Sequence, residues 1–243
     1  MPTSRRNCSG YLLSVDERSI LFDCGSGITQ EFLRNGCDPH NVDAIIISHM
    51  HPDHTSDLPY FIQTLKLEKK QSPLDLYLPD EAVNVIKSYL QTSYLLESRM
   101  PFALNIKSID GIISLDSPKA EIHPIPNNHL KVVAGDIEKY GYPNKMQCHS
   151  FMIESENKRI LYSADIESIN DIKEHLNNLD LLIIESAHID LHEMVKLIEV
   201  HDIKQTVFSH IPDAKEDEVR QMVDSYVGEK SLIMAEDGMV IDV

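Results

Sequence analysis

Four side chains that can bind a metal ion lie within six residues, in the pattern H-x-H-x-D-H: His49, His51, Asp53 and His54. In an extended segment, His49 and His51 point to the same side. A helix that starts directly afterwards can aim Asp53 and His54 at a neighbouring point, so one short turn can serve two metal ions. Imidazole and carboxylate suit Zn²⁺, and the lack of nearby thiolates is typical of a catalytic zinc site. The alternative is that the four polar residues cap a helix, as Asp53 alone could do.

The elements around this turn follow from the hydrophobic pattern. The continuous apolar run Val42–Ser48 predicts a buried strand of the parallel type that leads into the turn. Helical spacing predicts helices at about 28–35, 55–69, 80–97 and 190–201. Hairpins are expected from 11–15 with 19–23 and from 151–154 with 159–163, and further strands at 75–78, 181–185, 206–210, 232–234 and 239–242.

The two parts of the chain follow the same plan, with strands and helices repeated in each. The 243 residues suit one α/β domain, built as a four-layer αβ/βα sandwich from halves at about 1–125 and 126–243. In such folds, functional sites gather at the carboxyl ends of strands. The metal-binding residue types of this sequence stand at those ends, for instance His210 after the apolar run Thr206–Ser209.

Composition limits the class of function. Lys and Arg number 22 and Asp and Glu 39, so the net charge of −17 opposes non-specific binding of nucleic acid. The four scattered cysteines form no C-x-x-C pair and predict neither disulfides nor a thiolate zinc site. No apolar run is long enough to cross a membrane, and the first residues lack a secretory signal. We therefore expect a soluble, cytoplasmic protein.

Together these motifs resemble the metallo-β-lactamase superfamily over nearly the whole chain. Asp23, in Phe22-Asp23-Cys24-Gly25, is similar to its first aspartate motif, and His129, Asp165 and His210 are similar to its later metal ligands. The resemblance implies that His49, His51 and His129 hold one zinc ion, that Asp53, His54 and His210 hold the other, and that Asp165 bridges both. Mn²⁺ or Fe²⁺ could occupy the same ligands. Asp23 is expected to accept a hydrogen bond from a ligand histidine, or else to cap the glycine turn.

Within the superfamily, the sequence most resembles ribonuclease Z and its phosphodiesterase relatives. The stretch Phe22–Gln30 is similar to that family's opening motif, and Asp43–His49 is also similar. His188 precedes His210 by 22 residues, which resembles the spacing between a catalytic histidine and the last ligand. His188 could therefore protonate a leaving group, or be a surface histidine. His149 either points toward the site or has a structural role.

Several departures separate the chain from a tRNA-cleaving enzyme. The family's tRNA-binding arm lies between the third histidine and the bridging aspartate, and here His129 and Asp165 are only 36 residues apart. Ser26 and Pro52 stand where the family motif has Glu and Gly. The usual first strand with its glycine-rich loop is missing, so either the start is trimmed or the fold begins one strand late. With the negative charge, these features make a nucleic-acid substrate unexpected.

The expected function is hydrolysis of a small phosphodiester or nucleotide. Two zinc ions that share Asp165 would share a water, lower its pKa and provide a hydroxide nucleophile, with Asp53, Asp165 and His188 as catalytic residues. A lactone or thioester hydrolase and a non-catalytic metal-binding protein are the alternatives, since a fold does not fix a substrate. A di-iron redox site of the flavodiiron type is disfavoured by His51. Many relatives form dimers, so a homodimer is expected, with a small-molecule substrate and no membrane contact.

Overall fold

The computed structural model describes residues 3–116 and 118–243, which form two compact units. The N-terminal unit extends to Asp110 and includes Leu115–Lys119. The C-terminal unit comprises Gly111–Ser114 and Ala120–Val243. The strands at residues 113–116 and 119–126 belong to one seven-stranded sheet, and the division into two repeated halves at about residue 125 stays a prediction.

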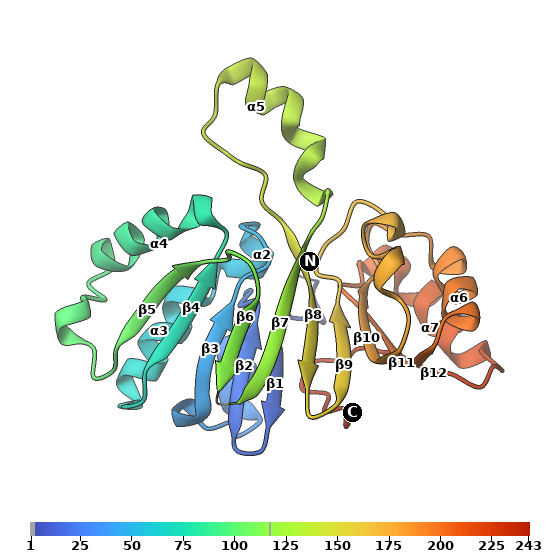
Figure 1. Cartoon of the computed structure of the whole chain (residues 1–243), viewed down its shortest axis with the longest axis horizontal. Coiled ribbons are helices and arrows are strands. Elements are labelled where there is room, and N and C mark those ends of the chain that lie inside the picture. Colours follow the sequence, from blue (N-terminus) through green and yellow to red (C-terminus); the bar gives the residue numbers. More distant parts are fainter. Residues whose placement is uncertain (1–2, 117) are drawn as a thin grey trace. The chain divides into compact units, whose positions relative to one another are not determined.

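The N-terminal unit is built on a five-stranded sheet with the strand order β1-β2-β3-β4-β5 (Figure 1). Its strands are β1 (Tyr11–Val15), β2 (Arg18–Phe22), β3 (Val42–Ile46), β4 (Leu74–Leu78) and β5 (Leu104–Ser108). The expected hairpin of β1 and β2 is confirmed, and the strands from β2 to β5 are mutually parallel. Its α-helices are α1 (Ile28–Arg34), α2 (Pro52–Thr55), α3 (Leu58–Leu67) and α4 (Asp80–Thr92). Ile45 and Leu76 of the sheet belong to one core with Phe61 of α3 and Ile86 of α4.

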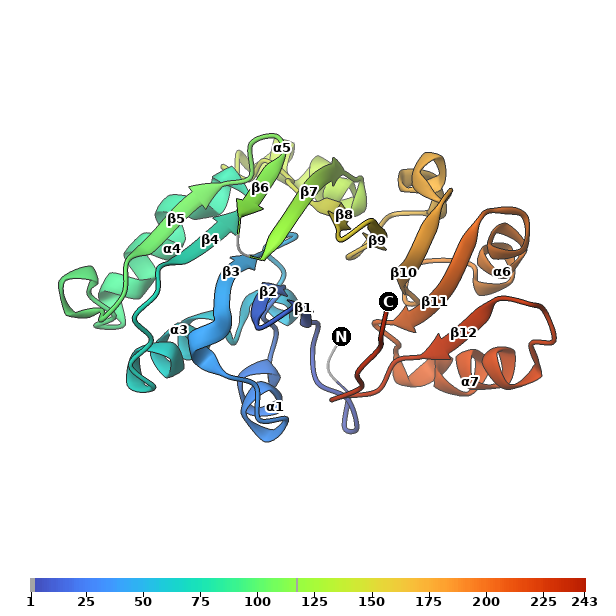
Figure 2. The ribbon, with the colours of Figure 1, turned by 60° about the horizontal axis from the view of Figure 1, so that its bottom comes forward.

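The C-terminal unit is built on a seven-stranded sheet with the order β12-β11-β10-β9-β8-β7-β6. Its strands are β6 (Ile113–Asp116), β7 (Lys119–Pro126), β8 (His149–Ser155), β9 (Lys158–Tyr162), β10 (Leu179–Glu185), β11 (Ile203–Ser209) and β12 (Ser231–Met234). The strands from β9 to β12 are parallel, so their carboxyl ends share one edge. The α-helices are α5 (Ala134–Tyr140), α6 (Leu191–Val200) and α7 (Glu216–Ser225). Figure 2 shows α6 and α7 beside β11 and β12, and Met194 and Val219 join their core.

Two expected elements are wrong in detail. The single helix expected at 55–69 is interrupted between α2 and α3, because the Asp57 N–H donates to the Cys24 carbonyl at 3.0 Å and Pro59 has no N–H to continue the helix. The strand expected at 239–242 does not form, and Val240 there is 86% exposed, so it gains no burial that would favour a strand. None of the helices in the described ranges is long and apolar enough to cross a membrane.

A short arm, residues 131–145, projects from the C-terminal unit and carries α5 (Figure 1). Nearly all of its residues are exposed, including Val132, Tyr140 and Tyr142. The sequence had left little room for an arm between His129 and Asp165. A helix of two turns nevertheless fits there, ending at Gly141 in a left-handed conformation with a φ of 66°.

Gly25 lies where two turns of the N-terminal unit touch. The Ser9 N–H donates to the Asp53 carbonyl at 3.2 Å, and the Gly25 N–H donates to the Ser9 carbonyl at 2.9 Å. A Cβ at Gly25 would meet the Asp53 oxygen at 2.0 Å and the Cys8 Cβ at 2.5 Å. Glycine is therefore required at this position for the backbone of the H-x-H-x-D-H turn to approach so closely.

Replacing Gly25 by Ala should lower the free energy of unfolding by about 3 kcal/mol, as overpacking against backbone does. Urea denaturation of Gly25→Ala and of the wild type measures the change. The matched control is Gly135→Ala in α5, where a Cβ has nothing within 4 Å and alanine suits a helix. A Gly25→Ala protein as stable as the control would contradict the packing argument.

Lys70 is a buried cation in the N-terminal unit. Its side chain is fully buried, and its ammonium donates to the His40 carbonyl at 3.2 Å and to the Ser72 hydroxyl at 2.6 Å. Burial is the main reason that the pKa of Lys70 falls to about 8, and the charge of Arg18 lowers it further. The folded protein therefore loses this proton at a lower pH than the unfolded chain does.

Because the folded pKa lies below the unfolded one, the contribution of Lys70 to stability should rise as the pH increases from about 8 toward the ordinary value of 10.5. Across that pH range, the unfolding free energy of the wild type should increase by up to about 3 kcal/mol relative to that of Lys70→Met. Lys87→Met, which removes an exposed lysine of α4, should show a constant difference. If the difference for Lys70→Met were also constant with pH, the lowered pKa of Lys70 would be refuted.

Candidate metal centre

The H-x-H-x-D-H turn leaves the carboxyl end of β3 as the sequence predicts. His51 is extended, with φ −61° and ψ 142°, and Pro52 then begins α2. The ring of His49 lies 4.7 Å from that of His51 and 4.2 Å from that of His54, measured between centroids. The rings are thus side by side, as expected for alternating residues followed by a helical turn. His49 and His54 are completely buried, whereas His51 is exposed. We call residues 49, 51, 53 and 54 the N-terminal cluster.

Asp23, at the end of β2, fixes the orientation of two of these histidines. Its buried carboxylate accepts hydrogen bonds from the Ser48 N–H at 2.8 Å and the Ser48 hydroxyl at 2.9 Å, and lies 2.8 Å from His54 Nδ1. The Ser48 hydroxyl is also 3.0 Å from His49 Nδ1. The structure therefore contains the predicted contact between Asp23 and a histidine of the N-terminal cluster. The bonds of Asp23 to Ser48 and His54 favour this role over a cap of the glycine turn.

These contacts determine the tautomers. Asp23 is a carboxylate and can only accept, so the proton of His54 resides on Nδ1. The one hydroxyl proton of Ser48 goes to Asp23, so His49 Nδ1 must donate to Ser48 in turn. In both rings Nε2 is then the atom suited to coordinate a metal ion, as is typical of ligand histidines held by an outer carboxylate. Sequence reasoning identified Asp23 but missed Ser48, although Ser48 is the residue next to His49.

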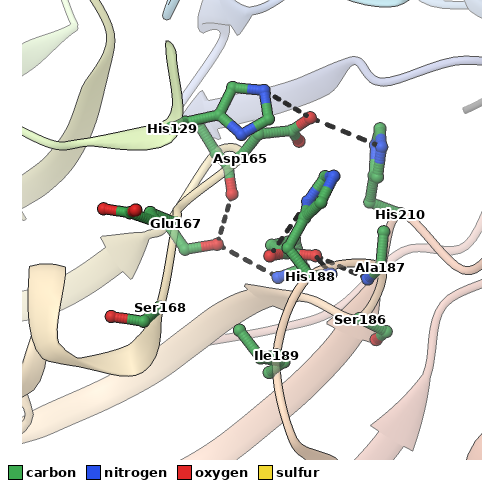
Figure 3. Close-up of polar contacts among 12 residues, drawn as sticks. His129, Asp165, Glu167, Ser168, Ser186, Ala187, His188, Ile189 and His210 are labelled. Carbon is green, nitrogen blue, oxygen red and sulfur yellow. Dashed lines mark hydrogen bonds and ion pairs between the residues drawn. The ribbon is translucent and has the colours of Figure 1, made fainter. Parts of the chain in front are cut away.

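The C-terminal unit brings together the other predicted ligands. The Oδ2 atom of Asp165, after β9, lies 3.7 Å from His129 Nε2 and 3.5 Å from His210 Nε2 (Figure 3). All three side chains are at most 9% exposed. Ala164, directly before Asp165, and His210 have φ values of 48° and 50°, a left-handed backbone that turns the chain sharply at the strand ends. We call residues 129, 165 and 210 the C-terminal cluster.

Asn127 ties two members of the C-terminal cluster together through their backbones. Its side-chain N–H groups donate to the Asp165 carbonyl at 3.0 Å and to the Ser150 hydroxyl at 3.1 Å. Its oxygen accepts from the His129 N–H at 3.1 Å. Because Asn127 is buried, these bonds use side-chain groups that would otherwise be costly to leave without partners. No sequence signal pointed to Asn127 beyond its place two residues before His129.

His188 lies beside the C-terminal cluster, with its ring centroid 4.9 Å from that of His129 and 6.2 Å from that of His210. Glu185, the last residue of β10, is 3% exposed and places a carboxylate oxygen 3.3 Å from His188 Nδ1. The hydrogen bond to Glu185 is the largest cause that raises the pKa of His188 above its ordinary value, against the opposing effect of burial. The side chain of His188 remains 41% exposed, so the imidazole is both anchored and accessible. Sequence reasoning did not single out Glu185.

His149 has a different position. It is the first residue of β8, is buried, and has its ring centroid 6.3 Å from that of Phe151. It pairs across the sheet with Pro126. These contacts favour the structural role for His149.

The chemistry of the donor groups fits zinc. The two clusters offer imidazole nitrogens and carboxylate oxygens, and ligand atoms of His49 and His51, of Asp53 and His54, and of His129 and Asp165 lie within 4.8 Å of each other in each pair. Such donors suit Zn²⁺, and Mn²⁺ or Fe²⁺ with similar ligands. Within the described ranges, the four cysteines are free thiols and supply no alternative thiolate set.

Two curated relatives are proteins named ribonuclease Z. The one from Methanosarcina mazei is 25% identical over 289 aligned residues, which cover 100% of this chain and 94% of the relative. The one from Pyrococcus abyssi is 32% identical over 128 residues, covering 53% of this chain and 41% of the relative. In that second alignment the chain thus spans less than half of the relative's length.

Solved structures show the same fold. The short form of human tRNase Z aligns with a TM-score of 0.74 at 17% identity, covering 99% of this chain and 94% of that one. The metallo-β-lactamase fold protein YhfI from Bacillus subtilis aligns with a TM-score of 0.72 at 21% identity and the same coverage. At these identities the likeness establishes the fold and leaves the substrate open. The family model of the beta-lactamase superfamily domain matches residues 18–211, so the chain belongs to the metallo-β-lactamase superfamily.

Proposed function

We propose that this protein is a metal-dependent phosphodiesterase in which the N-terminal and C-terminal clusters together hold two zinc ions. His49, His51 and His129 would bind one ion, and Asp53, His54 and His210 the other, with Asp165 shared. The observation that carries the proposal is the fixed orientation of the ligands: Asp23 and Ser48 set the tautomers of His54 and His49. A merely polar helix cap would not need such support.

The metal ions would supply Lewis acidity toward a phosphoryl oxygen and a bound water of lowered pKa. The chain's own residues supply positioning and a proton. Glu185 holds His188 through Nδ1 and favours its protonated form, so the other ring nitrogen can donate a proton to a leaving oxygen. The exposed part of His188 gives a substrate access to that proton.

A small phosphodiester or nucleotide is the substrate class that the charge of the chain favours, since −17 repels a polyanion. RNA is the second candidate, because the relatives are named ribonuclease Z and tRNase Z. The arm also carries groups that can contact RNA. Lys139 lies 4.8 Å from the ring of Tyr140, whose centroid is 5.8 Å from that of Tyr142, and aromatic and basic side chains of this kind stack on bases and bind phosphate. The homodimer and the cytoplasmic location stay predictions.

Purified protein should contain about two zinc ions per chain and hydrolyse bis(p-nitrophenyl) phosphate. Asp165→Ala should lose the bridging ligand and at least about 100-fold in turnover, since even changes outside the ligand set cost up to that much. Elemental analysis and a colorimetric assay measure the two quantities.

Asp224→Ala, which removes an exposed carboxylate of α7, is the matched control and should keep both properties. Two metal ions without turnover would exclude the phosphodiesterase and favour a lactone or thioester substrate. A folded protein that binds no metal would overturn the proposal. Faster cleavage of a 3′-extended RNA than of the small diester would replace the first substrate class by the second.

Asp23→Asn should weaken zinc binding by about 10- to 100-fold while leaving the fold intact. The amide would present N–H donors where Ser48 and His54 also donate, so at least one histidine must change tautomer. Competition with a zinc chelator measures the affinity. Asp38→Asn, at an exposed aspartate that caps the 3₁₀ turn Pro39–Asn41 of the same unit, should keep wild-type affinity. Equal affinity of both variants would show that Asp23 does not support the ligands.

A further inference from the structure

One lysine of the C-terminal unit holds the loop that carries His188. The Nζ atom of Lys215 donates to three backbone carbonyls, those of Ser186 at 3.0 Å, Ala187 at 3.2 Å and Ile189 at 3.0 Å. An ammonium group has three N–H donors, so these bonds use its full capacity. All three acceptors lie within four residues, and His188 stands among them.

Glu185 binds backbone N–H groups of the same loop, whereas Lys215 binds its carbonyls. One carboxylate oxygen of Glu185 accepts from the Ala187 N–H at 2.5 Å and from the His188 N–H at 2.9 Å. The loop has no helix or strand of its own between β10 and α6 to satisfy these groups. An anion therefore binds two N–H groups of this loop and a cation binds three of its carbonyls, which together are half of the backbone N–H and C=O groups of residues 186–190.

The place of Lys215 in the chain links this loop to the last expected metal ligand. Lys215 ends the 3₁₀ turn Asp213–Lys215, which follows His210 closely. β10 and β11 are parallel neighbours in which Glu185 pairs with Ser209. The segments that leave the two strand ends are thus adjacent, and the side chain of Lys215 joins them.

We propose that Lys215 is a positioning residue that fixes His188 beside the C-terminal cluster by binding the three carbonyls of its loop. Removing the ammonium would leave those carbonyls without their donor and allow the loop to take other conformations. Glu185 would still bind two N–H groups, so the loop would loosen but not detach. The effect should therefore appear on the proton that His188 delivers and leave substrate binding unchanged. This inference rests on the proposed phosphodiesterase function and on the acid role of His188.

The test compares two substrates in Lys215→Met, His188→Ala and the double variant. Diphenyl phosphate has a more basic leaving group than bis(p-nitrophenyl) phosphate and depends more on a proton donor. Lys215→Met should lower kcat for diphenyl phosphate by about tenfold, affect the nitrophenyl ester less and keep KM within about twofold. The double variant should be no slower than His188→Ala alone, because the two residues act on one step.

Lys215→Arg keeps a cation with several donors and should recover part of the lost kcat. The matched control is Lys204→Met, which removes an exposed lysine paired with Asp180 in the same unit and should leave both substrates unaffected. Equal losses on both substrates, a rise in KM alone, or additive losses in the double variant would overturn the positioning role.

Amide hydrogen exchange separates this inference from the proposed function. In a well-folded Lys215→Met protein, the amides of Ala187 and His188 should exchange faster than in wild type, whatever the substrate. Unchanged exchange would refute the hold on the loop even if the enzyme is a phosphodiesterase. Lack of turnover by the wild type, together with faster exchange in the variant, would instead count against the phosphodiesterase and the acid role of His188.

Discussion

Three carboxylates are buried at the ends of strands, and the arrangement of both clusters depends on how their charges are stabilised. Asp23, Asp165 and Glu185 are at most 3% exposed in a chain that is already strongly acidic. A buried carboxylate is costly unless hydrogen bonds or a cation compensate it. Around Asp23 and Glu185 the compensation comes from N–H groups, a hydroxyl and histidine rings of adjacent turns. Each of these two carboxylates therefore holds the loop whose N–H groups stabilise its charge, and the histidines of those loops are held in place as well.

The strand ends themselves have an unusual backbone. Asp23, Ala164 and His210 all have φ between 48° and 58°, in the left-handed region that residues with a side chain seldom adopt. Each such residue costs on the order of 1 kcal/mol. The cost recurs at the ends of β2, β9 and β11, where the chain must turn at once to present a carboxylate or an imidazole. Hydrogen bonds support the turns in which these residues lie: Asp23 bonds to Ser48 and His54, and Asn127 donates to the carbonyl of Asp165, the residue after Ala164.

The sequence predicted the elements whose apolar pattern is uninterrupted. The strand before His49 and the two hairpins were located correctly, because burial of apolar side chains decides them. β7 escaped prediction because Pro124 and Pro126 argue against a strand, yet its pairing with β8 tolerates them. The break between α2 and α3 depends on the Asp57 N–H bond to a carbonyl distant in sequence, which no local pattern encodes.

In the candidate site, too, some residues could be predicted from the sequence and others could not. The residues that could bind metal stand in motifs and could be named from the sequence, as could His188 from its spacing to His210. Their supporting partners could not be named from the sequence. Four residues provide this support mainly through bonds to the backbone or to a neighbouring ring: Ser48, Asn127, Glu185 and Lys215. Several residue types can make such bonds, so no sequence motif marks these positions. Parallel strands explain the difference. β9, β10 and β11 bring Asp165, Glu185 and His210 to one edge although tens of residues separate them, and that proximity exists only once the sheet has formed.

The arm shows where substrate choice is best sought. Residues that support the clusters are buried or partly buried, and several bonds constrain each of them, so they have little freedom to differ between substrates. Val132, Tyr140 and Tyr142 are more than half exposed, and burial in the fold does not account for them. Exposed apolar and aromatic side chains gathered on one projecting segment are typical of a surface that contacts something else. The proposed metal chemistry and the selection of substrate would then depend on different residues, which would allow one superfamily to keep its ligands and change its substrates.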